Sequence, residues 1–159
     1  MPTVIHARLP DPSRRRVEAR TDAGHAVVMD ADPPDGDGSG AGPKEALLAV
    51  LAGCTSMDVA SILGKKRQRA ESYELVVSGE VADEHPRVFT SITVEHRVRG
   101  AVDAEALRRA IELSATRYCP VSAMLSRAVR LEHRYHLERE DGTAVDAVVT
   151  VMGPEDAPG

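Results

Sequence analysis

Apolar and polar positions alternate most clearly along residues 87–99. Val88, Ile92, Val94 and Val98 fall on one face of this segment, and hydroxyl or charged side chains occupy most of the other. A period of two residues is typical of a β-strand with one buried face. Shorter runs, bounded by Gly, Pro and Asp, predict six further strands. They are expected at residues 3–9, 15–21, 25–30, 73–81, 129–138 and 144–152.

Residues 43–66 show a helical pattern in which apolar side chains lie on nearly every side. Pro43 suits the first helical position, where its missing N–H costs no hydrogen bond. Gly64 and the two lysines after it are typical of a helix end. A helix that is apolar nearly all round is expected to be buried.

Two shorter helices are predicted before the strand at residues 129–138. Asp103 is expected to cap the first helix, which ends near Tyr118. Pro120 begins the second. The order of strands, long helix, strands, helices and strands predicts an α+β domain, with antiparallel sheets wrapped around a buried central helix.

The chain length of 159 residues fits a single domain. We expect this domain to span residues 1–152. Residues 153–159 are expected to form a flexible tail.

Charge and composition restrict the classes of partner. The chain carries 20 basic and 25 acidic residues, and no face is clearly basic, so nucleic acid is not an expected partner. Residues 1–10 lack the apolar core of a signal peptide. Residues 46–63 contain Asp58 and several hydroxyl groups, which makes them too polar for a membrane span. We therefore expect a cytoplasmic protein with no membrane partner.

Cys54 and Cys119 are the only cysteines of the chain. In the cytoplasm they are expected to be reduced at rest, so a disulfide between them would be transient and functional. Cys54 lies one helical turn before Asp58, and a buried carboxyl group needs a polar partner, so a polar pocket is expected there. Packing of Cys54 as a small core residue is an equal alternative.

Cys119 stands directly before Pro120, which places its thiol near a helix N-cap. Free N–H groups and the helix dipole stabilise a thiolate at such a position. This argument makes Cys119 the more acidic of the two thiols. A packed cysteine at a helix junction fits the same pattern equally well.

A resident metal or cofactor is not expected. His133 and His136 are three residues apart on a strand, so they face opposite ways and cannot share an ion. The two cysteines lack zinc-ligand spacing. Residues 35–40 resemble the start of a calcium-binding EF-hand loop, but its twelfth position is Ala46 and not a glutamate.

Three blocks of sequence carry a resemblance to a known family. They are residues 42–48, residues 51–59 with Ala-Gly-Cys-Thr around Cys54, and residues 118–125 with Cys-Pro-Val from Cys119. Together they resemble the OsmC/Ohr family, the osmotically inducible protein C and organic hydroperoxide resistance proteins. The resemblance extends over residues 15–140 and is nearest to the OsmC-like branch.

The resemblance implies an intertwined homodimer with active sites at its interface. It also implies oxidative stress defence, through reduction of organic hydroperoxides and, less well, of hydrogen peroxide. By match to the family motif, Cys54 would be the peroxidatic thiol and Cys119 the resolving thiol. An external dithiol would reduce their disulfide, and no cofactor would be needed.

The family's peroxidases also carry an arginine and a glutamate that activate the first thiol. Here the best matches are Arg20 and Glu45, and Lys44 is another source of positive charge. An alternative within the same fold is a non-catalytic dimer that senses redox state or binds a small apolar molecule. A structural domain with inert thiols is a third interpretation.

Overall fold

The structure, a computed structural model, describes residues 2–154. The predicted α+β class is confirmed, with a long helix and two sheets. Two compact units divide the chain after Leu47, and we call them the N-terminal and C-terminal units. Most of the tail expected at residues 153–159 lies beyond Pro154, outside the described residues.

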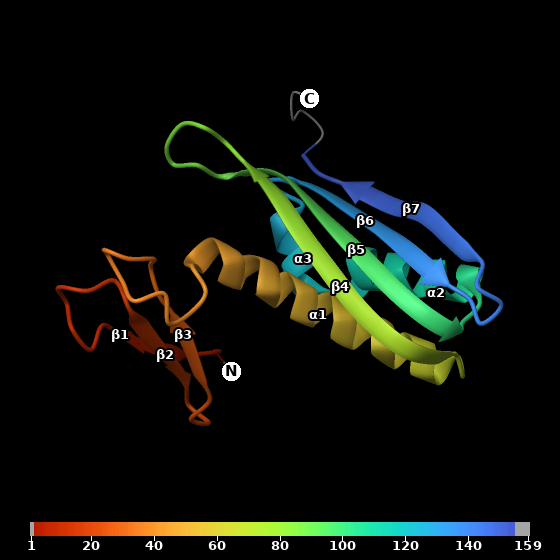
Figure 1. Ribbon diagram of the computed structural model, residues 1–159, viewed down its shortest axis with the longest axis horizontal. Coiled ribbons are helices and arrows are strands. Elements are labelled where there is room, and N and C mark those ends of the chain that lie inside the picture. Colours follow the sequence, from red (N-terminus) through yellow and green to blue (C-terminus); the bar gives the residue numbers. More distant parts are fainter. Residues whose placement is uncertain (1, 155–159) are drawn as a thin grey trace. The chain divides into compact units, whose positions relative to one another are not determined.

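A three-stranded antiparallel sheet forms the N-terminal unit, with β2 in the middle (Figure 1). The loop after this sheet is organised around Asp30, whose carboxylate accepts hydrogen bonds from the hydroxyl and backbone N–H of Ser39. These bonds are the main cause that lowers the pKa of Asp30 to about 2. A Cβ at Gly36 would lie 2.1 Å from the carbonyl oxygen of Ala31, so the loop requires glycine there. The strands are β1 (Ile5–Arg8), β2 (Val17–Thr21) and β3 (Ala26–Met29).

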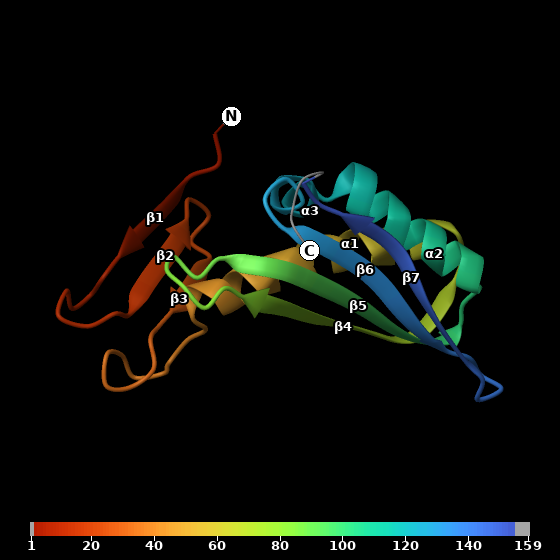
Figure 2. The same cartoon turned by 90° about the horizontal axis from the view of Figure 1, so that it is seen from above.

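A four-stranded sheet in the order β4–β5–β6–β7 forms the centre of the C-terminal unit. Its helices cover one face of this sheet (Figures 1 and 2). The strands are β4 (Arg69–Val81), β5 (Phe89–Ala101), β6 (Arg130–Glu138) and β7 (Ala144–Met152). The helices are α1 (Pro43–Lys65), α2 (Ala104–Leu113) and α3 (Pro120–Leu125), and a single π-helical turn, Ser114–Tyr118, joins the last two.

The core lies between the helices and the sheet. One cluster joins the second half of α1 to α2, and includes the fully buried Val59 and Leu107. The other surrounds Cys119 and includes the fully buried Leu51. Truncating such a leucine to alanine costs about 2–5 kcal/mol of stability. The thiol region is therefore built into the core of the C-terminal unit.

One strand pairing differs from the predicted antiparallel arrangement. Strands β5 and β6 pair in parallel, with Ile92 opposite Leu131. The connection between them contains α2 and α3, and a crossover of this length returns the chain in the same direction. Alternation of side chains predicts a strand but not its direction, so the sequence pattern did not reveal this pairing.

Helix α1 is buried along one side only, which corrects the expectation of a fully buried helix. Thr55 and Val59 face the core with no exposed surface, whereas Val50 is 54% exposed and Met57 is 74% exposed. By length and composition α1 also suffices to cross a membrane, with a mean hydropathy of 1.9 over 18 residues. The core helix of a soluble protein reaches the same values, so the expectation that α1 does not span a membrane stays a prediction. This exposed apolar side agrees with the expectation that α1 lies near a dimer interface, which stays a prediction.

Candidate functional site

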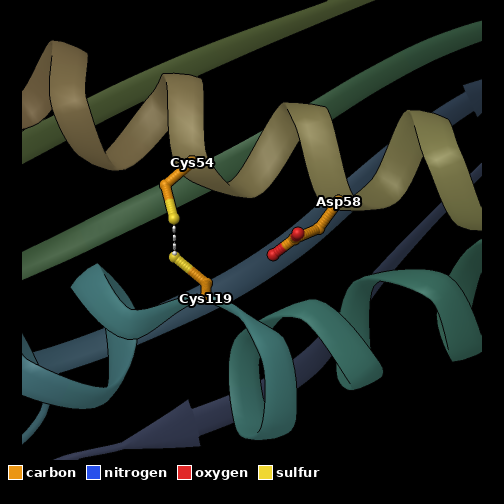
Figure 3. A group of neighbouring side chains, drawn as sticks. All are labelled: Cys54, Asp58 and Cys119. Atoms are coloured by element: carbon orange, nitrogen blue, oxygen red, sulfur yellow. Dashed lines mark hydrogen bonds between the residues drawn. The ribbon is translucent and has the colours of Figure 1, made fainter. Parts of the chain in front are cut away.

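Helix α1 and the start of α3 bring the two cysteine sulfurs together. The Sγ atoms of Cys54 and Cys119 share a hydrogen bond and lie 2.9 Å apart (Figure 3). Both are free thiols; Cys119 is 2% exposed, and Cys54 is partly exposed. Two sulfurs at this separation are positioned for a reversible disulfide. The sequence motifs therefore predicted a real proximity.

Local structure around Cys119 favours its thiolate. Cys119 is the N-cap of α3, and its sulfur accepts a hydrogen bond from the backbone N–H of Ser122 at 3.3 Å. The hydroxyl of Thr55 on α1 donates to the same sulfur at 3.8 Å. Burial opposes ionisation, but hydrogen bonds from Cys54, Ser122 and Thr55 outweigh it and lower the pKa of Cys119. The sequence argument for an acidic Cys119 is confirmed.

The environment of Cys54 has the opposite effect. Burial is the main cause that raises the pKa of the Cys54 thiol. The hydrogen bond with Cys119 and the negative charge of Asp58 act in the same direction. The two opposite shifts make Cys119 the more acidic thiol of the pair.

Asp58 completes a compact group with the two thiols. It lies one turn after Cys54 on α1, and the hydroxyl of Ser114 donates to its Oδ2 at 3.1 Å. One carboxylate oxygen of Asp58 and the two sulfurs all lie within 4.8 Å of one another. The carboxylate of Asp58 thus has the polar partner that its partly buried position was expected to require. A hollow of about 550 Å³ adjoins Asp58, lined also by Leu113 and Tyr118.

A chain of buried polar side chains crosses strands β4, β5 and β6. The hydroxyl of Tyr73 bonds to Nδ1 of His96 at 2.7 Å, and Nε2 of His96 bonds to Nδ1 of His133 at 3.4 Å. Burial lowers the pKa of His96 to about 3 and that of His133 to about 4, so both are neutral at pH 7. Among the described residues, His133 Nε2 and Ser122 Oγ are buried polar atoms without a hydrogen-bond partner.

Sequence reasoning missed His96 but placed His133 correctly. His133 is buried and His136 pairs with Asp146 on the other face of the sheet, so the prediction that they face opposite ways is confirmed. His96 follows the alternation of Ile92, Val94 and Val98. Its place on the apolar face of this strand could have identified His96 as a buried residue.

Residues 36–134 match the family model described as OsmC-like protein. The matched span contains both cysteines and Asp58. The chain belongs to the OsmC-like protein family. The family predicted from the sequence blocks is therefore confirmed.

Relatives of this OsmC-like protein include protein YhfA of Escherichia coli (strain K12). The two are 38% identical over 116 residues, which cover 72% of this chain and 84% of YhfA. Among solved structures, a hypothetical protein from Aquifex aeolicus VF5 is 25% identical, with a TM-score of 0.77 over 88% of this chain and 98% of its own.

The organic hydroperoxide resistance protein OhrB of Bacillus subtilis has the same fold. Its TM-score is 0.60 at 15% identity, over 85% of this chain and 98% of its own. At this identity the likeness shows the fold alone.

Arg20 and Glu45, the residues expected to activate Cys54 in an OsmC-like peroxidase, belong to the N-terminal unit. Arg20 is an exposed residue of β2, opposite His6 and Ala26. Glu45 accepts a hydrogen bond from the backbone N–H of Gly42 at 2.8 Å and so caps the start of α1. Their catalytic roles, like that of Lys44, stay predictions. Within the C-terminal unit, an oxygen of the Asp58 carboxylate lies within 4.8 Å of both sulfurs.

Proposed function

We propose that this OsmC-like protein is a thiol peroxidase. It reduces organic hydroperoxides, and hydrogen peroxide less well, by forming a disulfide between Cys54 and Cys119. The observation that carries the proposal is the 2.9 Å separation of the two sulfurs. An inert pair of core cysteines has no need for such proximity, whereas a resolving step requires it.

The reaction divides between the two thiols according to exposure and acidity. Cys54 is the more exposed, so its sulfur meets the peroxide, while the Cys119 thiolate accepts its proton. Attack on the O–O bond leaves a sulfenic acid on Cys54 and releases an alcohol. Cys119 then attacks this sulfur, a disulfide forms and water leaves. An external dithiol restores both thiols.

A cation beside Cys54 would favour this attack, since a thiolate is the nucleophile. Arg20, oriented by Glu45, is the proposed cation, and Lys44 is the alternative. Lys44 would act as a point charge, without the planar fork that lets an arginine bind a carboxylate through two hydrogen bonds.

Exposed apolar side chains on the helices that carry the two thiols support a preference for organic substrates. Met57 on α1 is 74% exposed and Met124 on α3 is 63% exposed, and these two elements carry the cysteines. An apolar surface binds the hydrocarbon tail of an organic peroxide but gains nothing from hydrogen peroxide.

Peroxide consumption with a dithiol reductant tests the proposal. Wild-type protein should consume cumene hydroperoxide faster than hydrogen peroxide. Cys54→Ser should abolish turnover, and Cys119→Ser should react once and then stop as a sulfenic acid or a higher oxide. A Cys54→Ser variant with wild-type turnover would refute the proposal.

A second candidate function is a non-catalytic dimer that senses redox state or binds a small apolar molecule. It is favoured by the raised pKa of Cys54, because a protonated thiol reacts slowly with peroxide. The same assay separates the two functions. A non-catalytic protein forms the disulfide slowly and stoichiometrically and shows no turnover.

A further inference from the structure

The group formed by Cys54, Asp58 and Cys119 has the composition of a metal site. Its three side chains offer two sulfurs and a carboxylate oxygen, all within 4.8 Å of one another (Figure 3). Thiolate and carboxylate are ligands that Zn²⁺ accepts, and three protein ligands leave a fourth position open. Cys54 and Asp58 are four residues apart on α1, a spacing that puts both side chains on one face of a helix.

We propose that Cys54, Asp58 and Cys119 bind one thiophilic divalent cation, Zn²⁺ by ligand preference, in the reduced protein. Metal binding is a separate function from the peroxide chemistry proposed above, although both use the same two sulfurs. Spacing along the sequence does not reveal it, because Cys119 joins the other two ligands only through the fold.

Surrounding hydrogen bonds hold the three ligands as an outer shell of a metal site does. The Ser114 hydroxyl donates a hydrogen bond to Oδ2 of Asp58 and so holds the carboxylate in place. Cys119 Sγ accepts from the backbone N–H of Ser122 and the hydroxyl of Thr55. These hydrogen bonds orient the ligand side chains and leave lone pairs available for a metal ion.

Charge around Asp58 also favours a cation. Asp58 is only partly exposed, and it takes part in none of the ion pairs found among residues 2–154. Lys65 and Lys66 line the adjoining hollow without pairing with it. A bound divalent ion would neutralise two of the three negative charges of the carboxylate and two thiolates, leaving a net charge of −1 on the group.

The geometry needs a small adjustment. Two sulfurs bound to one tetrahedral Zn²⁺ at 2.3 Å lie about 3.8 Å apart. The observed separation is 2.9 Å, so the thiols must move apart by roughly 1 Å. Side-chain rotation of the partly exposed Cys54 provides this movement without a change of backbone.

Metal and disulfide exclude each other, because each needs both sulfurs. If the proposed peroxidase reaction occurs, one hydroperoxide and two protons convert the zinc-bound dithiolate into a disulfide, an alcohol, water and free Zn²⁺. The dithiolate loses two electrons and the O–O bond gains them. This consequence rests on the proposed function, whereas metal binding itself does not.

Zinc titration of the reduced, metal-free protein tests the proposal. With a chromophoric chelator as competitor, we expect one Zn²⁺ per chain. Asp58→Asn should weaken binding by at least about tenfold, in the range that loss of a metal-site contact produces. Asp83→Asn, on the exposed β4–β5 connection, is the matched control and should bind as wild type does. Cys54→Ser and Cys119→Ser should each reduce binding further.

A second measurement needs no variant. Co²⁺ added to the reduced wild-type protein should give thiolate charge-transfer absorption, and prior oxidation with diamide should remove it. Absence of stoichiometric zinc binding, or an affinity that Asp58→Asn leaves unchanged, would overturn the site. Zinc binding without peroxide turnover would refute the proposed function alone, and turnover without zinc binding would refute the metal site alone.

Discussion

The two thiols differ in acidity although their sulfurs are 2.9 Å apart. Cys119 is stabilised as a thiolate by donors on α1 and α3, whereas Cys54 is next to a carboxylate. Hydrogen bonding and local charge therefore set the order of ionisation. Under the proposed function, the acidic Cys119 serves as base and later as nucleophile, and the accessible Cys54 receives the oxygen.

Removing the charge of Asp58 should make Cys54 more reactive. Asp58→Asn is expected to lower the pKa of Cys54, and alkylation of the Cys54 peptide by iodoacetamide at pH 7 should speed up about two- to fivefold. The change is modest because burial is the larger cause of the raised pKa. The rate is measured by mass spectrometry in the presence of a chelator. Equal rates in Asp58→Asn and its control Asp83→Asn would contradict this account.

Replacing Arg20 tests the predicted activating cation. If Arg20 stabilises the Cys54 thiolate, Arg20→Ala should raise the pKa of Cys54 and slow its alkylation at pH 7. Arg8→Ala, also on an exposed strand of the N-terminal sheet, is the control. An alkylation profile that Arg20→Ala does not alter would remove Arg20 from the site.

At the scale of elements, the central strands carry polar groups inside an apolar layer. His96 on β5 and His133 on β6 have no exposed surface and remain neutral at pH 7. These histidines can be buried only in the neutral form, because burying an unpaired charge raises the free energy of the folded state. The sheet is therefore expected to be sensitive to acid.

Stability should fall as the pH drops below about 6.5, the ordinary pKa of histidine. Below it the unfolded chain binds protons that the folded chain, with pKa values of about 3 and 4, does not. Each of these two histidines should lower the free energy of unfolding by about 2 kcal/mol between pH 7 and pH 5. Urea unfolding at both pH values measures this loss. His133→Met should reduce it by about half, while His136→Asn, on the outer face, should leave it unchanged; an equal loss in all three proteins would exclude the buried pair as the cause.

Most elements could be predicted from the sequence, because period, caps and turn residues are local signals. The helix starts at Pro43 and Pro120 and the strand at residues 144–152 match the structure. Two features could not be predicted from the sequence: the parallel pairing of β5 with β6, and the position of Asp58 beside Cys119. Both depend on contacts between segments that are distant along the chain. The site residues could therefore be grouped only once the fold was known.

For the molecule as a whole, the important feature is the apolar side of α1 that a single chain leaves exposed to solvent. Helix α1 has only 22% of its most apolar 18-residue window buried. A soluble chain rarely leaves such a surface in water. We therefore retain the prediction of an obligate homodimer with α1 near its interface.

A charge on this side should break the dimer. Val50→Glu is expected to shift the mass in light scattering from two chains to one at micromolar concentration, because an interface core excludes unpaired charge. Val148→Glu is the control, since Val148 is 57% exposed on β7 and Val50 is 54% exposed. Wild-type protein with the mass of a single chain would refute the prediction outright.

The cysteine pair also has a topological consequence. A bond between sulfurs 65 positions apart would close a covalent ring containing β4, β5 and α2. Ring closure removes conformations from the unfolded chain, which for this length corresponds to about 4 kcal/mol. Calorimetry should therefore show a higher Tm for oxidised than for reduced protein. By the same thermodynamic cycle, the folded chain holds its disulfide more tightly than the unfolded chain does, so the entropy of the coil helps set how strong a reductant the protein requires.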